Sequence, residues 1–312
     1  MQYREFGDTG IRVSEIGVGC GQLAGGAKGD MDKALLRAVE LGINLFDTAD
    51  SYGRSEEILG RVLRGIPRDQ VVFATKFGTV IEPDGRGSHQ DHSVGHMVEA
   101  LEGSLRRLRT DYIDIYQVHT PRPPCLEDEQ LWGTMDRLVE QGKIRCYGMS
   151  LDGTDVAMKF LNNTRGKGIQ MIFNLFHQEA RDRLLDEIEK RRVGLIAKVP
   201  LAGGSLSDRF GPDWPGPEDG RRKRWGEENV RRRLDLLDQA KPILRANGRS
   251  TVQGALAWLL TISPNTVPIP GISSLQRLEE TAAAAGMRLT AAEMKALDEI
   301  EGGAVRQADF PY

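Results

Sequence analysis

The alternation of short apolar segments with longer amphipathic ones predicts an α/β protein, built as an eight-stranded (β/α)8 TIM barrel. Eight strand–helix pairs of about 30 residues can be counted from Glu15 onward, and such alternation requires parallel strands joined by right-handed crossovers. Three expected strands end in an ionisable side chain, Asp47, Lys76 or His119, which indicates chemistry on the C-terminal rim. An open doubly wound sheet is disfavoured because no GxGxxG follows the first strand.

The chain is expected to begin with a small β-hairpin that plugs the barrel floor. Tyr3–Phe6 and Ile11–Val13 have strand character, and a loop containing Gly7 and Gly10 separates them.

Each barrel strand is predicted from a short apolar run, and each helix from apolar residues at helical spacing with start or stop residues. The strands are expected at Glu15–Gly19, Ile43–Asp47, Val71–Lys76, Tyr112–His119, Ile144–Ser150, Ile169–Asn174, Val193–Lys198 and Thr266–Pro270. The barrel helices are expected from Asp30 to a stop at Gly42, at Ser55–Leu63, from Ser93 to about Leu108, and at Leu126–Glu140, Asp155–Leu161, Arg183–Arg191, Val252–Leu260 and Leu275–Ala285. Ser55 and Ser93 are expected to cap the second and third of these helices.

Extra segments are expected beyond the barrel. Leu201–Trp225, after the seventh strand, is too rich in Gly, Pro and charge for regular structure, and a rim loop of this length is usually functional. Extra helices are expected at Glu227–Ala246 and Leu289–Ile300. The tail, Ala304–Tyr312, could cover the barrel mouth with its aromatic residues.

The composition suits a single globular domain over residues 1–312. Apolar residues make up 39%, charged residues 28%, and the formal net charge is −3, which gives no reason to expect a nucleic-acid or membrane partner. The scattered cysteines Cys20, Cys125 and Cys146 fit a reducing cytoplasm, and no Cys/His cluster indicates a metal. We therefore expect a cytoplasmic monomer or small homo-oligomer acting on a small molecule.

Asp47, Tyr52, Lys76 and His119 are the candidate catalytic residues. Tyrosine ionises near pH ~10 in water, so a phenol that exchanges a proton near neutrality needs a nearby cation. Lys76 would supply that charge, and Asp47 would keep the desolvated amine protonated. His119 would donate a hydrogen bond to a substrate carbonyl or share in proton transfer. Such a set suits the reduction of a carbonyl group by a cofactor that supplies hydride.

The sequence resembles the aldo-keto reductase superfamily over nearly its whole length, about Tyr3 to Ile300. The motifs FDTADSYG, ATKFG, DYIDIYQVH, VPLAGG and VPIPGISSLQRLEE occur in the family's order and spacing. The resemblance implies the same eight-stranded barrel and a catalytic tetrad at the four residues above, with Tyr52 as general acid. It also implies a nicotinamide cofactor extended across the rim and an aldehyde, ketone or alcohol substrate.

Cofactor contacts follow from the resemblance alone. The implied residues are Ser150 and Gln170 near the nicotinamide amide, Leu201, Gly203, Ser205 and Arg209 around the pyrophosphate, and Gly271, Ser273, Arg277 and Glu280 in the closing motif. Lys198 occupies the position where the family commonly has an aromatic ring stacked on the nicotinamide. Its charge would serve the pyrophosphate or an acidic substrate, unless it simply pairs with a neighbouring carboxylate. Arg277 favours NADP(H) over NAD(H), because its guanidinium suits a phosphomonoester.

Two other functions are compatible with these residues. The potassium-channel β subunits resemble the same family and keep the tetrad, so a cofactor-binding regulatory subunit is one alternative. A Schiff-base aldolase using Lys76 is a weaker one, because pairing with Asp47 favours a charged lysine. His89, His92 and His96 lie in a polar segment entering a helix, and we interpret them as solvated loop residues rather than metal ligands.

Overall fold

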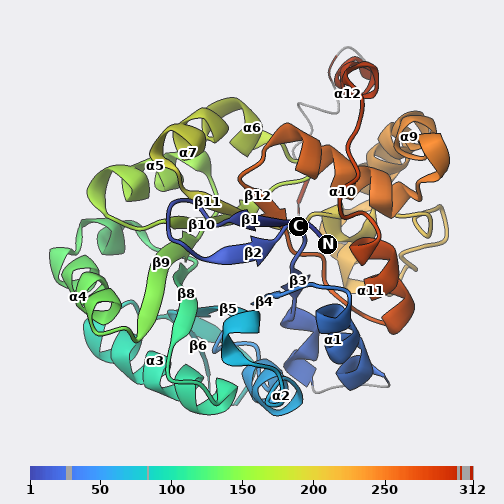
Figure 1. The fold of residues 1–312 in the computed structure, drawn as a ribbon. Helices are drawn as coiled ribbons and strands as arrows, with labels where there is room; N and C mark the ends of the chain where they lie inside the picture. The colour runs from blue at the N-terminus through green and yellow to red at the C-terminus, as the bar shows by residue number, and fades with distance from the viewer. Residues whose placement is uncertain (26–29, 83, 301–302, 304–309, 312) are drawn as a thin grey trace.

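The computed structural model describes residues 1–25, 30–82, 84–300, 303 and 310–311, and it contains a parallel eight-stranded barrel (Figure 1). The barrel strands are β3 (Val18–Gly19), β4 (Leu45–Asp47), β5 (Val72–Phe77), β8 (Ile113–His119), β9 (Ile144–Ser150), β10 (Gly168–Ile172), β11 (Gly194–Lys198) and β12 (Thr266–Pro268). The helices outside them are α1 (Met31–Glu40), α2 (Ser55–Val62), α3 (Val94–Leu108), α4 (Glu129–Glu140), α5 (Thr154–Asn163), α6 (Glu179–Arg183), α7 (Leu185–Arg191), α10 (Thr251–Ile262) and α11 (Leu275–Ala282). The predicted (β/α)8 barrel is confirmed.

The first and last strands close the barrel. Sheet order runs β3-β4-β5-β8-β9-β10-β11-β12, and Gly19 forms a parallel bridge with Gly271 just beyond β12. Two backbone hydrogen bonds join the same edges, from Gly17 N to the Pro268 oxygen (2.9 Å) and from Gly19 N to the Pro270 oxygen (3.0 Å). A Cβ at position 19 would lie 2.8 Å from the Ile269 oxygen, so this close approach requires glycine.

The predicted N-terminal hairpin is confirmed. β1 (Tyr3–Glu5) and β2 (Arg12–Ser14) pair antiparallel and lie across one end of the barrel, the floor (Figure 1). Phe6, Ile11 and Val13 are buried against strand residues such as Ile115 and Ile196. The hairpin therefore fills the floor of the barrel with apolar side chains.

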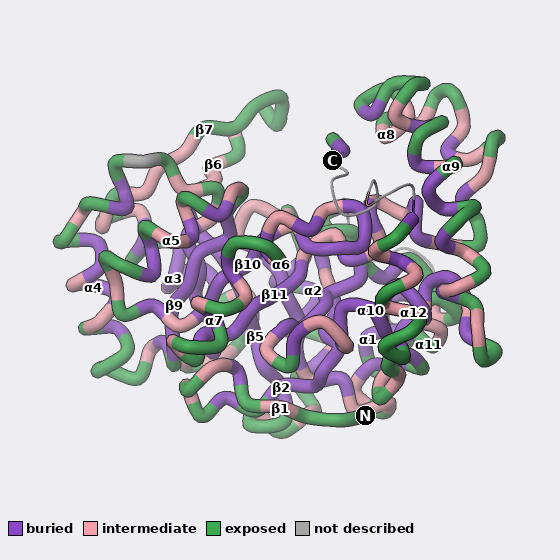
Figure 2. The backbone as a smooth tube through the Cα atoms, turned by 90° about the horizontal axis from the view of Figure 1, so that it is seen from above, coloured by how far each residue is buried: buried purple, intermediate pink, exposed green. Residues whose placement is uncertain are grey.

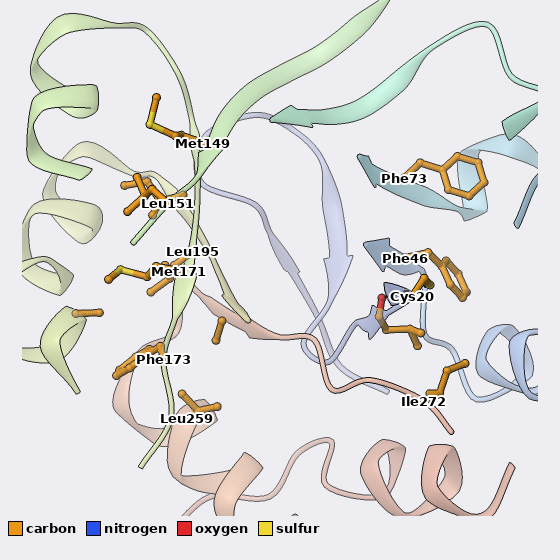
Figure 3. Close-up of a cluster of buried hydrophobic side chains, with 14 of the residues drawn as sticks. Cys20, Phe46, Phe73, Met149, Leu151, Met171, Phe173, Leu195, Leu259 and Ile272 are labelled. Atoms are coloured by element: carbon orange, nitrogen blue, oxygen red, sulfur yellow. Dashed lines mark hydrogen bonds between the residues drawn. The ribbon is translucent and has the colours of Figure 1, made fainter. Parts of the chain in front are cut away.

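Alternate strand residues build two apolar cores. The barrel interior holds Leu45, Val72, Ala74, Ile115, Cys146, Ile196 and Val267. The residues between them, such as Phe46, Phe73, Met149, Met171 and Leu195, belong to the larger core between strands and helices (Figure 3). Since side chains alternate along a strand, the residue two positions after an interior apolar residue also faces the interior. This alternation aims the last residue of several strands into the barrel mouth.

Most helix ends agree with the prediction, and the exceptions have local causes. Ser93 caps α3 as expected, accepting from the His96 backbone N–H. Ser55 does not cap α2, and that prediction was wrong: Arg54 occupies the N-cap, while the Ser55 hydroxyl donates to the Cys20 oxygen. The fourth helix begins later than expected because Asp128 caps it, and a 3-10 turn, η3 (Pro123–Glu127), precedes it.

Two additions rise above the rim on opposite sides of the mouth (Figure 2). One is a hairpin of β6 (Thr79–Ile81) and β7 (Ser88–Gln90), which the sequence did not predict. The other contains α8 (Gly220–Trp225) and α9 (Glu227–Leu244). Leu201–Trp225 was expected to lack regular structure, and this was wrong at two places. The segment contains α8, whose first turn is capped by Asp219, and the 3-10 turn η4 (Ala202–Gly204). The remaining elements are α12 (Ala291–Asp298) and the 3-10 turns η1 (Gly21–Gly25), η2 (Arg68–Gln70) and η5 (Ala246–Gly248).

The C-terminal tail is described in part. Phe310 is buried and contacts Phe176, with a ring-centroid separation of 5.7 Å, whereas Tyr312 lies outside the described residues. Within the described ranges, no helix is both long and apolar enough to span a bilayer.

Candidate active site

A polar layer lies directly above the apolar interior of the barrel. Asp47, Lys76, Gln117, Ser150 and Gln170 are all buried, and each belongs to a barrel strand. The alternation of side chains places each of them two residues after an interior position: Asp47 follows Leu45, and Lys76 follows Ala74. The fold thus brings polar residues from five strands to one level of the barrel.

Lys76 and Asp47 form a buried ion pair at this level. The Lys76 Nζ lies 2.8 Å from Asp47 Oδ1 and also donates to the Thr48 oxygen at 2.6 Å. Burial alone would lower the pKa of the Lys76 amine, but Asp47, helped by Tyr52, outweighs burial, and the pKa is raised. The amine therefore stays charged near neutral pH.

The other Asp47 oxygen accepts hydrogen bonds from two amides. Gln170 Nε2 donates to Asp47 Oδ2 at 2.6 Å, and Gln117 Nε2 approaches the same oxygen at 3.5 Å. The Ser150 hydroxyl in turn donates to Gln170 Oε1 at 2.9 Å. Ser150 and Gln170 were expected near a nicotinamide amide, and the structure links both to the Lys76–Asp47 pair.

Tyr52 reaches the same site from the turn after β4. The Lys76 Nζ lies 5.1 Å from the centroid of the Tyr52 ring, within the range of a cation–π contact. The Tyr52 and His119 rings meet edge to face, with centroids 5.8 Å apart. The four residues expected to form the catalytic group therefore lie together on the rim.

His119 is neutral in this environment. Burial lowers the pKa of its imidazole to about 3, and the positive charges of Lys76 and Lys198 act in the same direction. The Ser51 hydroxyl lies 3.5 Å from His119 Nδ1. A neutral imidazole can donate one hydrogen bond to a ligand, but it is not an ordinary proton source at pH 7.

Two side chains fix the backbone of His119: Gln90 of the β6–β7 hairpin and His92, two residues after it. His92 Nε2 lies 3.1 Å from the His119 oxygen. With the amide of Gln90 oriented to satisfy both its polar atoms, its nitrogen donates to the same oxygen at 3.1 Å and to the Gly78 oxygen at 2.8 Å. Sequence reasoning placed His89, His92 and His96 in a solvated loop. His89 is exposed and pairs with Glu82. That interpretation was wrong for His92 and His96, which are half-buried against the Phe77 ring, with His96 inside α3.

Asp50 is a largely buried acid two residues before Tyr52. Burial, together with the negative charge of Glu56, raises the pKa of the Asp50 carboxyl to about 7. Its Oδ1 is buried with no hydrogen-bond partner among the described residues. The surrounding charges are Glu56 on α2, Arg107 on α3 and Lys76 on β5.

Five of the expected cofactor-binding residues line one cavity of about 240 Å³ beside the barrel closure, with contributions from the η4 turn and α11. They are Leu201, Arg209, Gly271, Arg277 and Glu280. The lining of the cavity includes two arginines and Gly204 of the η4 turn, which supply the donors that a phosphate-bearing group requires. The acids in the lining, Asp208 and Glu280, accept hydrogen bonds from the Thr251 and Ser250 hydroxyls. The residues therefore fit the phosphate end of a nicotinamide cofactor.

Gly203, Ser205 and Ser273 are not among the residues that line this cavity. Ser205 is fully buried, donating to the Ala202 oxygen and accepting from Arg233 Nη1 at 2.9 Å. A Cβ on Gly203 would meet the Trp225 ring at 2.7 Å. Ser273 is exposed just before α11, where the neighbouring Ser274 is the N-cap.

Lys198 ends β11 and pairs with Asp152 of the loop after β9, with Nζ 3.1 Å from Oδ1. Lys198 is half-buried, and burial lowers the pKa of its amine although Asp152 opposes this. The alternative that this lysine pairs with a carboxylate is thus observed.

Sequence reasoning missed Gln117, Asp152 and the β6–β7 hairpin. Gln117 was detectable, since it lies two residues before His119 and so faces the same side of its strand. No sequence pattern identified Asp152, because its partner Lys198 lies on a strand distant in the sequence.

Comparisons with known proteins agree with this fold. The chain matches the family model described as "Aldo/keto reductase family" over residues 15–302, and it therefore belongs to this family of nicotinamide-dependent oxidoreductases. It is similar to the aldo-keto reductase yakc of Schizosaccharomyces pombe, whose name includes NADP(+), with 30% identity over 92% of this chain and 88% of the relative. The NADH-specific methylglyoxal reductase of Escherichia coli K12 is 29% identical, over 96% and 98% of the two chains.

A solved structure shows the same architecture. The glycerol dehydrogenase AKR11B4 from Gluconobacter oxydans superposes with a TM-score of 0.85 at 27% identity, covering 96% of this chain and 94% of that one.

Proposed function

We propose that this chain is an NADP(H)-dependent oxidoreductase that interconverts aldehydes or ketones with alcohols, with Tyr52 as general acid and base. The observation that carries the proposal is the charged Lys76 amine, fixed by Asp47 at 2.8 Å and lying over the Tyr52 ring. Family membership supports the reaction class, and the geometry supports the choice of these residues.

Each residue has a distinct role in the proposed reaction. The bound cofactor supplies a hydride, and a carbonyl compound plus NADPH and one proton gives the alcohol plus NADP⁺. Tyr52 donates the proton to the carbonyl oxygen as negative charge develops there. Lys76 stabilises the resulting phenolate, and Asp47 keeps Lys76 charged. His119, neutral at pH 7, donates a hydrogen bond to the same oxygen.

The cavity residues are proposed to hold the cofactor. Arg277 and Arg209 bind its phosphates, and Leu201, Gly271 and Glu280 form the surrounding wall. Ser150 and Gln170 orient the nicotinamide amide above the Asp47 network. Gly203 and Ser205 shape the η4 turn from within, because Ser205 is fully buried under Arg233, and Ser273 precedes the α11 cap.

A carbonyl panel assayed with NADPH and NADH side by side tests this function. Turnover of at least one aldehyde or ketone is expected, and this turnover should depend on the Tyr52 hydroxyl. Binding of either nucleotide without turnover across the panel would contradict the enzyme proposal and favour a regulatory subunit.

The NADP(H) preference has its own test at Arg277. Arg277→Ala is expected to lower the NADPH-to-NADH ratio of kcat/KM about tenfold, because a guanidinium–phosphate contact is lost. Arg106→Ala, on the exposed face of α3 and outside the cavity, is the matched control. An unchanged ratio in Arg277→Ala would show that another residue reads the phosphate.

A further inference from the structure

Lys198 faces the barrel mouth rather than the phosphate cavity. Ile196, two residues earlier on β11, packs in the barrel interior, so the alternation of side chains turns Lys198 to the same side one level higher. Its charge acts on His119, Lys76 and Asp47, and it is not among the residues that line the cavity holding Arg277. Its amine therefore belongs to the site where a substrate would bind.

The two lysines of the site are neutralised in different ways. Lys76 is fully buried, and its partner Asp47 is held by Gln170 at 2.6 Å. Lys198 keeps 24% of its side chain exposed, and its partner Asp152 keeps 68% exposed. An ion pair open to water contributes little stability and exchanges readily. The first pair is fixed, whereas the second can be replaced.

We propose that Lys198 selects carbonyl substrates that carry a carboxylate group. This inference rests on the proposed function and names its substrate class. The carboxylate of the substrate takes the place of the Asp152 carboxylate on the Lys198 amine, while the carbonyl oxygen lies between Tyr52 and His119.

A carboxylate suits this position better than an uncharged tail. Lys198 already binds a carboxylate at 3.1 Å, so the substrate's group reproduces an existing contact. The exchange also releases Asp152 to water, where an exposed acid costs nothing in desolvation. An uncharged tail would leave the Lys198–Asp152 pair in its path or force the half-buried amine to lose its partner.

The test compares a four-carbon aldehyde that bears a terminal carboxylate with its methyl ester. The wild-type enzyme is expected to show a higher kcat/KM for the carboxylate, and Lys198→Met to lower the carboxylate-to-ester ratio about tenfold, the effect of one charge-assisted hydrogen bond. Lys198→Arg should restore most of the ratio. Added salt should reduce the wild-type preference, because part of the contact is exposed.

Asp152→Asn gives an independent measurement that does not depend on the stability of Lys198 variants. Removing the competing carboxylate is expected to lower the KM for the carboxylate substrate severalfold. An unchanged ratio in Lys198→Met, or an unchanged KM in Asp152→Asn, would overturn the inference while ester turnover left the proposed function intact. Weaker NADPH binding in Lys198→Met with the ratio unchanged would assign the lysine to the cofactor and also overturn it. If neither compound is reduced, the proposed function fails and this inference fails with it.

Discussion

The floor and the rim of the barrel each contain a buried charge, and they treat it differently. At the floor, the buried Glu15 accepts hydrogen bonds from Arg4 (2.9 Å), Arg288 (2.8 Å) and the backbone N–H of Gly286. At the rim, the buried Lys76–Asp47 pair is also hydrogen-bonded, but Tyr52 and His119 beside it are only half-buried. The floor encloses its charge completely, whereas the rim leaves reactive side chains open to a ligand.

Both ends of the barrel contain buried polar atoms without a partner among the described residues, but those at the rim adjoin the candidate catalytic residues. They are Asp50 Oδ1 and Gln117 Oε1 at the rim and Thr266 Oγ1 at the floor. Unsatisfied polar groups of this kind are unfavourable to folding and concentrate at functional sites. Substitutions at the floor should therefore reduce stability, and those at the rim should reduce activity.

The largest expected effect is on the rim. Tyr52→Phe should lower kcat for carbonyl reduction roughly 1000-fold, because the proton donor is lost. Thermal stability and NADPH binding, followed by nucleotide fluorescence, should change little, since the ring is retained. A kcat within about threefold of wild type would remove Tyr52 from the proposed mechanism.

The floor should give the opposite pattern. Glu15→Gln is expected to reduce the free energy of unfolding by about 2–3 kcal/mol. Arg4 and Arg288 would both lose their negatively charged partner, and water compensates for it only in part because both guanidinium groups are partly buried. Denaturant unfolding measures this change. The kcat per folded molecule should stay at the wild-type value, and a selective loss of kcat without loss of stability would break the distinction between floor and rim.

A smaller effect is expected at His92, two residues after the β6–β7 hairpin, where its ring supports the rim through the His119 backbone. His92→Phe removes one of the donors to the His119 oxygen while keeping an aromatic ring against Phe77. We expect kcat to fall about tenfold through misplacement of His119, with KM for NADPH unchanged. His89→Phe, in the exposed strand β7, is the matched control and should have wild-type kinetics.

The smallest expected effect is a pH-dependent gain in stability at Asp50. The folded-state pKa of about 7 exceeds the ordinary carboxyl value, so the folded chain binds more protons than the unfolded chain between about pH 4 and pH 7. Stability from this group is therefore present at low pH and is lost as pH rises through 7. Asp50→Asn should raise stability by about 1–2 kcal/mol at pH 8 and change it little at pH 4. A loss of stability at pH 8 would contradict this interpretation.

Much of the barrel, and the clustering of the four candidate catalytic residues, was predictable because period-two alternation and strand ends are local features of sequence. Asp47, Lys76 and His119 each close an apolar run, and the fold places such ends on one rim. The β6–β7 hairpin was missed because its second strand, SHQ, is polar and exposed. Its first strand, Thr79–Ile81, was indicated only by three consecutive residues with strand propensity, TVI.

Long-range contacts set the limit of sequence reasoning. Ser205 was expected near phosphate, but its burial depends on Arg233, which approaches from α9 28 residues later. The Lys198–Asp152 pair joins β11 to the loop after β9, and no local pattern identifies that partner. Such contacts depend on how the elements are arranged in space, which the sequence pattern of one segment does not contain.

In the proposed mechanism Lys76 acts through Tyr52, and a double-mutant cycle on the hydride-transfer step measures this coupling. Lys76→Met should slow single-turnover reduction about 100-fold in the wild-type background but less than about threefold in the Tyr52→Phe background. Equal losses in both backgrounds would show that the lysine acts independently of the tyrosine, and that result would contradict the mechanism.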